Sequence, residues 1–274
     1  MTFYSHTDFK AQLKYSKGPE PLNWLFLPGG PGFGSESLDN LAEQLSLPGK
    51  SWYMDFPNDG SNQISANQHF EGWSDGLIDL LSHFENPIIV AHSFSGMLVL
   101  SNKKLENYLY GLVLLNTAPN NTWLHQIEKQ AKQYDLPDIS EIATQYEKNK
   151  NNDTFKALTI ACAPYFFSPE SLDKGMKLLE ILPYSNESYD WATTMFHPRF
   201  TNAFIPQTIP TLVVGGEIDH ITPFDLFMSD ERWQRSNIQL KLIKNEGHFP
   251  WLNSGENLQN IFYKYIESMN LCPI

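Results

Sequence analysis

Short apolar segments alternate with helical patterns along most of this chain of 274 residues, and this alternation strongly limits the possible folds. Segments such as Trp24-Leu25-Phe26-Leu27 and Leu112-Val113-Leu114-Leu115 are apolar at every position, which indicates strands buried on both faces. The segments between them carry apolar residues three and four positions apart, as amphipathic helices do. Together these patterns predict an α/β fold with a mostly parallel central sheet flanked by helices.

The expected elements also divide the chain into two parts. Strands are expected at 24–27, 52–54, 88–91, 112–115, 211–214 and 238–243, and helices at 35–45, 68–84, 97–105, 224–233 and 256–269. Between them, helical patterns follow one another without a strand, at 123–134, 139–148, 153–161 and 172–182. We therefore expect a core domain formed by residues 1–116 and 207–274. Residues 117–206 would form a helical cap subdomain over the carboxyl edge of the sheet, where open α/β sheets bind ligands.

Composition excludes several classes of function. The chain has 19 Lys and Arg against 31 Asp and Glu, a formal charge of −12, which argues against binding to nucleic acid or to an acidic membrane surface. There is no apolar run of about 18 residues and no signal-peptide pattern at the start. Cys162 and Cys272 lie far apart and are expected to be free thiols in a reducing compartment. These features predict a cytoplasmic protein and leave its oligomeric state open.

The segment Ala91-His92-Ser93-Phe94-Ser95-Gly96 follows an expected strand and begins an expected helix. A serine at such a sharp turn, with small residues two positions before and after it, is typical of the nucleophile elbow of serine hydrolases. Ala91 and Ser95 provide those small residues. Ser93 is therefore the candidate nucleophile, and an N-cap serine is the structural alternative.

A glycine-rich loop, Pro28-Gly29-Gly30-Pro31-Gly32, follows the first of the expected strands. Acyl transfer needs N–H donors aimed at the oxyanion of the tetrahedral intermediate. The backbone N–H groups of Phe94 and Gly30 are the candidates for this oxyanion hole, with Gly29 as the substitute for Gly30, because proline has no N–H.

Two alternatives remain for this loop. One is a simple turn. The other is a dinucleotide-binding loop, because Gly30, Gly32 and Gly34 precede a strand that ends at Asp55. That pattern is imperfect, since the third glycine comes one position early and Pro31 removes an N–H that would face a phosphate.

Asp219 and His248 follow the last two expected strands. The chain order Ser93, Asp219, His248 is the order of the catalytic triad in α/β-hydrolases. In such a triad the histidine moves the serine proton, and the carboxylate orients the imidazole and stabilises its charged form. A lone Asp or His at a strand end is often structural, but this combination at strand ends predicts catalysis.

The spacing of the remaining histidines along the sequence does not indicate a metal site. His92 lies in the elbow, where its side chain is expected to point away from the substrate. No metal-ligand spacing is formed by His6, His69, His83, His125 and His197. The sequence predicts no metal and no cofactor.

With these motifs, the chain resembles proteins of the α/β-hydrolase fold over nearly its whole length, and within them the proline iminopeptidase group. The group typically has His-Gly-Gly-Pro-Gly where this chain has residues 28–32, and segments similar to 210–223 and to the cap segment 189–200. The resemblance implies an α/β-hydrolase fold with an inserted helical cap. It also implies a small-molecule or short-peptide substrate.

This chain departs from the group where an aminopeptidase would bind the substrate ammonium. His220 and Arg199 stand where acidic side chains are usual, and a positive charge there would repel an ammonium group. Asp190 or Glu187 could substitute for them. Gly29, His220, Trp191 and Arg199 are the candidate substrate-pocket residues. The cap aromatics Trp123, Tyr165, Phe166, Phe167 and Trp191 could line a pocket, although core packing is the preferred interpretation.

Three functions follow from these observations. The leading hypothesis is a serine hydrolase that cleaves a small ester or amide through an acyl-enzyme. The second is a prolyl aminopeptidase. The third is a ligand-binding protein with the hydrolase fold and little turnover. The sequence does not identify the substrate.

Overall fold

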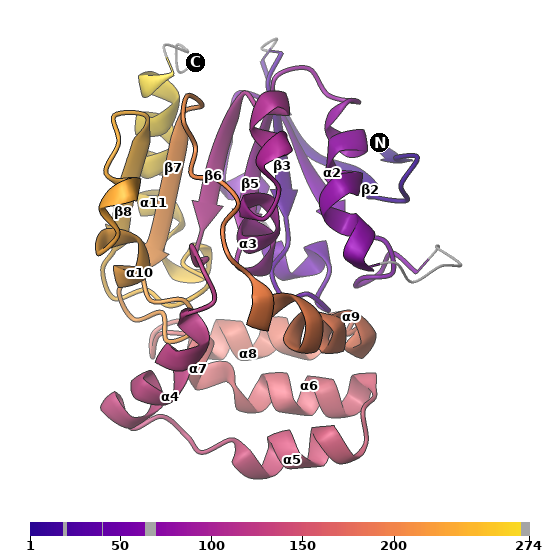
Figure 1. The fold of residues 1–274 in the computed structure, drawn as a ribbon, viewed down its shortest axis with the longest axis vertical. Coiled ribbons are helices and arrows are strands. Elements are labelled where there is room, and N and C mark those ends of the chain that lie inside the picture. The colour runs from indigo at the N-terminus through magenta and orange to yellow at the C-terminus, as the bar shows by residue number, and fades with distance from the viewer. Residues whose placement is uncertain (19–20, 40, 64–69, 270–274) are drawn as a thin grey trace.

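A computed structural model describes residues 1–18, 21–39, 41–63 and 70–269. The described strands form one eight-stranded sheet in the order β1-β2-β4-β3-β5-β6-β7-β8 (Figure 1). Strand β2 pairs antiparallel with β1 and β4, and the pairs from β4 to β8 are parallel. The strands are β1 Thr2–Tyr4, β2 Lys10–Lys17, β3 Asn23–Leu27, β4 Gly49–Asp55, β5 Pro87–His92, β6 Gly111–Leu115, β7 Thr211–Gly216 and β8 Ile238–Ile243.

Helices cover both faces of this sheet. They are α1 Leu41–Leu45 and α11 Trp251–Ser268 on one face, and α2 Trp73–Leu81, α3 Phe94–Leu100 and α10 Asp225–Met228 on the other. Successive residues of β3 point to opposite faces, so Leu25 and Leu27 pack with α2 and α3, while Trp24 and Phe26 pack with α1 and α11. The strand is therefore apolar at consecutive positions because it is buried on both sides.

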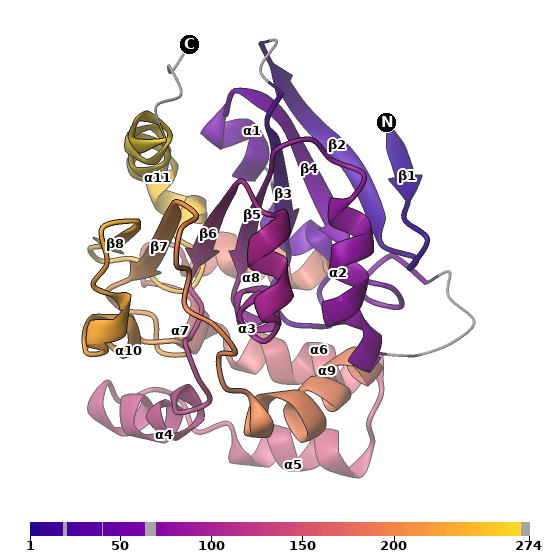
Figure 2. The same cartoon turned by 45° about the horizontal axis from the view of Figure 1, so that its top comes forward.

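The cap helices come between β6 and β7 in the chain. They are α4 Trp123–Gln133, α5 Ser140–Lys148, α6 Asn152–Ala161, α7 Ala163–Phe166, α8 Leu172–Ile181 and α9 Asn186–Trp191, followed by a π-helical turn at Ala192–Phe196 and a 3₁₀ turn at His197–Arg199. Figures 1 and 2 show these helices together beyond the carboxyl ends of the parallel strands. The division into a core and a cap remains a prediction.

The six strands expected from the sequence are all present in the sheet. The antiparallel strands β1 and β2 were not expected. The helix expected at 35–45 is two short helices, a 3₁₀ turn at Ser35–Leu38 and α1, because Asp39 takes a positive φ between them. Residues 68 and 69 of another expected helix, with His69, lie outside the described residues, as does Cys272. No helix in the described ranges is long and apolar enough to cross a membrane.

The buried carboxyl group of Asp59 joins helix α9, in the predicted cap, to the glycine-rich loop. Its Oδ1 accepts hydrogen bonds from the Gly32 N–H (2.6 Å) in the glycine-rich loop and from the Ser188 hydroxyl (2.6 Å) in α9. A second contact runs the other way, since the Ser185 N–H donates to the Gly32 carbonyl at 2.9 Å. Burial raises the pKa of Asp59 to about 7, although the hydrogen bonds from Ser188 and Gly32 lower it in part.

This raised pKa predicts how stability depends on pH. Between about pH 4 and pH 7 the folded protein keeps the Asp59 proton that the unfolded chain loses, so this group reduces stability as the pH rises through that range. The Asp59→Asn variant carries no charge to bury. Its free energy of unfolding, relative to wild type, should therefore increase from pH 4 to pH 8 by on the order of 4 kcal/mol, at about 1.4 kcal/mol per pKa unit.

Urea unfolding of both proteins at several pH values measures this difference. Asp135→Asn is the matched control, because Asp135 is exposed and its positive φ suits asparagine. A difference between Asp59→Asn and wild type that stays constant with pH would contradict the prediction.

Candidate active site

Ser93 lies at the tight turn between β5 and α3. Its backbone has φ 52° and ψ −119°, a strained conformation for a residue other than glycine. Hydrogen bonds hold the turn, since the Ser93 N–H donates to the Leu115 carbonyl (3.0 Å) and the Thr117 hydroxyl donates to the Ser93 carbonyl (2.6 Å). A Cβ at Gly96 would lie 2.6 Å from the Thr117 side chain, so only glycine fits there. The side-chain hydroxyl of Ser93 is thereby presented at the sheet edge.

His248 lies in the loop between β8 and α11, with its ring between Ser93 and Asp219. Its Nε2 is 2.8 Å from the Ser93 Oγ, and its Nδ1 is 2.8 Å from the Asp219 Oδ2. A carboxylate accepts only, so Nδ1 donates to Asp219, and in the neutral form of the ring Nε2 is the atom that can accept from the serine hydroxyl. All three side chains are buried. The geometry is that of a serine activated by a neighbouring base.

Asp219 follows β7 and is held as an anion. Its Oδ1 accepts from the backbone N–H groups of Ile221 and Thr222 (both 2.9 Å), and its Oδ2 accepts from the Asn116 amide (3.0 Å) and the Thr222 hydroxyl (2.9 Å). Burial alone would raise the pKa of Asp219. The charge of His248 and the hydrogen bonds outweigh burial, so the pKa lies well below its ordinary value.

Neither Asn116 nor Thr222 was predicted from the sequence as a site residue. Asn116 directly follows β6 with a positive φ of 46°, which asparagine tolerates better than most residues, and its amide also donates to the Gly247 carbonyl at 3.0 Å. Asn116 could have been found in the sequence, because it is a polar residue directly after β6, and β6 lies between the strands that precede Ser93 and Asp219. Thr222 lies three positions after Asp219, within the segment used for the resemblance.

His92 packs behind His248. Its Nε2 donates to the His248 carbonyl at 3.0 Å, and its ring packs against Phe249 and Trp251. Burial and the nearby His248 hold its pKa well below the usual range. His92 is therefore a neutral support for the loop that carries His248.

The loop of Gly247 is closely packed against the cap. The His248 N–H donates to the Phe166 carbonyl at the end of α7 (2.6 Å). A Cβ at Gly247 would lie 2.3 Å from that carbonyl oxygen, so this approach requires glycine. The cap thus helps to fix the position of the His248 backbone.

The glycine-rich loop has few N–H groups available for an oxyanion. Pro28 and Pro31 have none, and the N–H of Gly32 is bonded to Asp59. Gly30 has φ +104° and lines the cavity beside Ser93. Phe94 is the first residue of α3, where the backbone N–H has no partner within the helix. These two N–H groups are the best candidates for the oxyanion hole.

The same contacts argue against a dinucleotide at this loop. The Gly32 N–H is already bonded to Asp59. Asp55 accepts a hydrogen bond from the Ser35 N–H at 2.6 Å and forms an ion pair with Lys10 at 3.1 Å. The carboxylate that would hold a ribose hydroxyl is therefore engaged within the protein.

A cavity of about 310 Å³ lies between the sheet edge and the cap. Beside Ser93 and His248 it is lined mainly by apolar side chains from the cap and core, including Phe33, Met97, Trp123, Leu124, Ile127, Ile139, Ala143, Leu158, Tyr165 and Phe166. Burial lowers the pKa of His197 to about 4 and raises that of Cys162 to about 12, so both of these lining residues are uncharged near neutral pH.

The predicted pocket residues are not those of the cavity. His220 faces α4, where its Nδ1 lies 3.1 Å from the Gln130 Oε1, and its ring contacts Tyr134. Trp191 packs with Trp73 behind Phe94, and Arg199 is exposed. None of these three residues, nor Gly29, is among the described residues that line the cavity.

Gly29 lies close behind the elbow, since a Cβ there would be 2.6 Å from the His92 ring and 3.0 Å from the Ser93 Cβ. Of the five cap aromatics, Trp123, Tyr165 and Phe166 line the cavity. Core packing is also present, because Trp123 belongs to one part of the hydrophobic core and Phe166 packs against another.

Comparison with known proteins gives a consistent result. The model of the alpha/beta hydrolase family matches residues 24–258. An esterase from Thermogutta terrifontis has a TM-score of 0.71 at 16% identity, with 98% of each chain covered. A proline iminopeptidase-related protein from Thermus thermophilus has a TM-score of 0.72 at 18% sequence identity, with 98% of each chain covered. The proline iminopeptidase of Mycobacterium smegmatis has a TM-score of 0.64 at 15% sequence identity. The match covers 98% of this chain and 99% of the iminopeptidase.

At these identities the structural likeness shows the fold alone. No curated protein matches the sequence. The predicted α/β-hydrolase fold and the similarity to proline iminopeptidases are confirmed. The family match covers most of the chain, and the protein belongs to the alpha/beta hydrolase family.

Proposed function

We propose that this protein is a serine hydrolase that cleaves small esters with an apolar acyl group through an acyl-enzyme. The observation that carries the proposal is the hydrogen-bonded chain from the Ser93 Oγ through His248 to Asp219, at the wall of an apolar cavity. Such a chain supplies both a nucleophile and a base.

In the proposed reaction, the Ser93 oxygen attacks the carbonyl carbon of the substrate while its proton passes to the His248 Nε2. The carbonyl oxygen becomes an oxyanion, and the N–H groups of Gly30 and Phe94 stabilise it. Collapse of this intermediate breaks the bond to the leaving alcohol, which takes the proton from His248. A water molecule then repeats the sequence on the acyl-enzyme and releases the acid. Throughout, Asp219 stabilises the positively charged imidazole.

The cavity favours an apolar substrate group. A charged group would lose its hydration on entry, and the described residues that line the cavity include no Asp, Glu, Lys or Arg to compensate. An aliphatic or aromatic acyl group instead gains about 0.8 kcal/mol for each buried methylene. We therefore favour esters of apolar acids over charged substrates.

A prolyl aminopeptidase is less well supported. No carboxylate is among the described residues that line the cavity. Asp190, one of the two acids considered as a substitute, instead accepts hydrogen bonds from Tyr146 (2.8 Å) and Lys150 (3.2 Å). Turnover of a proline anilide that is lost when its amine is blocked would reverse this preference.

A ligand-binding protein with little turnover is the remaining alternative. The Ser93–His248 distance of 2.8 Å argues against it, because proton transfer needs no rearrangement at that distance. A small molecule that raises the melting temperature and is recovered unchanged would favour this alternative.

A fluorophosphonate probe tests the nucleophile directly. We expect wild type to be labelled at Ser93, and Ser93→Ala to lose the label. Turnover of p-nitrophenyl butanoate should fall by roughly 10⁴-fold or more in Ser93→Ala and in His248→Ala. Peptide mass spectrometry locates the label, and a spectrophotometric assay measures turnover.

Ser101→Ala is the matched control for this experiment, because Ser101 follows the other end of α3 and does not line the cavity. The Ser101→Ala variant should be labelled by the probe, and should hydrolyse p-nitrophenyl butanoate, as wild type does. Folded wild-type protein that takes no label, or Ser93→Ala protein that labels equally well, would refute the assigned nucleophile.

Filling the cavity should change the preference for acyl length. Ala143 lines the cavity from α5 in the cap. Ala143→Phe should lower kcat/KM for p-nitrophenyl hexanoate by about 10-fold or more, because each methylene excluded from the cavity forfeits about 0.8 kcal/mol. The kcat/KM for the acetate ester, whose acyl group leaves that space empty, should change by less than about 2-fold.

Ala157→Phe is the control, since Ala157 is exposed on the neighbouring helix α6. It should leave the ratio of the two kcat/KM values unchanged. Equal losses for acetate and hexanoate in Ala143→Phe would mean that the acyl group binds elsewhere.

A further inference from the structure

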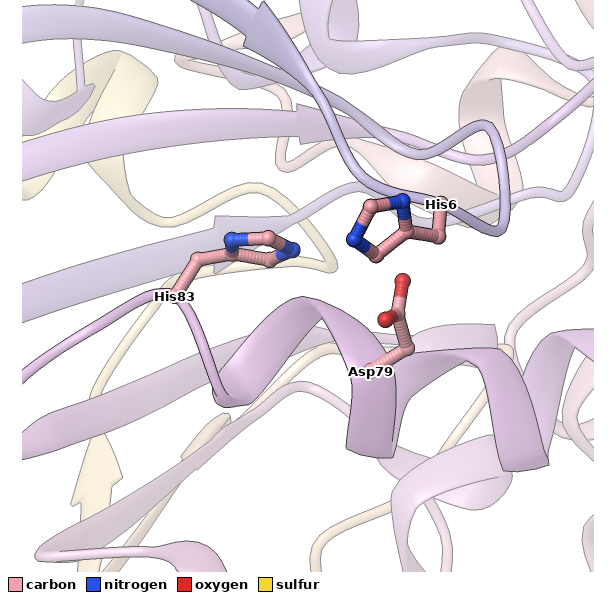
Figure 3. A group of neighbouring side chains, drawn as sticks. All are labelled: His6, Asp79 and His83. Carbon is pink, nitrogen blue, oxygen red and sulfur yellow. The ribbon is translucent and has the colours of Figure 1, made fainter.

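Three potential metal ligands from two distant segments meet at the surface, away from Ser93. His6 lies in the turn between β1 and β2, Asp79 lies in the last turns of α2, and His83 follows the end of that helix. One ligand atom from each of the three lies within 4.8 Å of the others. Figure 3 shows the two imidazole rings facing each other beside the Asp79 carboxylate.

Contacts around these residues limit their freedom. The Thr7 N–H and hydroxyl donate to the Asp79 Oδ2 at 3.2 and 3.1 Å, so the turn that carries His6 is tied to α2. The His83 ring packs against Phe3 with ring centroids 5.7 Å apart, and it lies at the same distance from the His6 ring. The two segments are therefore already joined before any ion is considered.

Asp79 supplies the carboxylate ligand of the group. The net charge of −12 over the whole chain also attracts cations.

We propose that His6, Asp79 and His83 form a surface site for one divalent transition-metal ion, such as Zn²⁺, which links the β1–β2 turn to the end of α2. Two imidazole nitrogens and one carboxylate oxygen suit Zn²⁺, Co²⁺, Ni²⁺ or Cu²⁺ and do not suit Mg²⁺ or Ca²⁺, which take oxygen ligands. Three protein ligands leave a further position for water.

The geometry needs only a small adjustment. With metal–ligand bonds of about 2.0–2.1 Å, tetrahedral ligand atoms lie roughly 3.4 Å apart. His6 and His83 are both exposed, so small side-chain rotations can close the difference from 4.8 Å.

The place of the site in the fold predicts what the ion would do. His83 follows the end of α2 that points away from the cap helices (Figure 1). Bound metal would therefore stabilise the attachment of the N-terminal strands, with no direct contact with the Ser93 hydroxyl.

Histidine spacing along the chain did not reveal this group, because His6 is remote in sequence from the other two. The interval from Asp79 to His83 places two ligands one helical turn apart, which is a weak signal by itself. The third ligand, His6, reaches the other two only because the β1–β2 turn packs against α2.

Titration of the tag-free, chelator-treated full chain with ZnCl₂ tests the site. Calorimetry should give one Zn²⁺ per chain, and saturating Zn²⁺ should raise the melting temperature. Co²⁺ should give the visible absorption of a site with nitrogen and oxygen ligands. His83→Ala and His6→Ala should each weaken Zn²⁺ binding at least 10-fold and abolish the rise in melting temperature.

The variant Asp79→Asn keeps an acceptor for Thr7 but loses the charge, and it should also weaken binding. His125→Ala, at an exposed histidine of α4, is the control and should bind as wild type does. Unchanged melting temperatures without metal would show that the variants remain folded. Absence of stoichiometric binding, or binding unaffected by His6→Ala and His83→Ala, would overturn the proposal.

Discussion

The buried negative charge of Asp219 is the constraint on which the site geometry depends. A carboxylate only 2% exposed is costly unless hydrogen bonds and an opposite charge replace its water. The partners come from different loops, Asn116 after β6, Thr222 in its own loop and His248 after β8. Satisfying this charge therefore draws three strand ends together. The imidazole that results has one nitrogen on the carboxylate and the other toward Ser93.

Much of this arrangement could be predicted from the sequence because it follows from topology. Runs that are apolar at every position predict a parallel sheet, and the carboxyl ends of parallel strands share one edge. Residues in the loops that follow such strands are brought to the same edge, which is why Ser93, Asp219 and His248 could be grouped across 155 positions of sequence. The small residues around Ser93 similarly follow from a local steric demand.

The parts that could not be predicted depend on packing between distant segments. The sequence Lys10–Lys17 alternates polar and apolar residues and is only partly buried, so β2 lacks the continuous apolar run that marked the other strands. In the cap, sequence position suggested Trp191 and Arg199 for the pocket. The rotation of each helix decides which side chains face inward, and it turns Trp191 toward Trp73 and leaves Arg199 exposed.

The helices between β6 and β7, the predicted cap, are hydrogen-bonded to the loops that carry His248 and Gly30. The cap carbonyl of Phe166 holds the backbone of His248, while Ser185 and Ser188 hold the glycine-rich loop through Gly32 and Asp59. A cap that moved away from the sheet as a rigid body would break both sets of bonds. It would thereby release the loop of His248 and the glycine-rich loop together. Because much of the apolar lining of the cavity comes from the same block of helices, the shape of the cavity and the positions of these two loops are coupled.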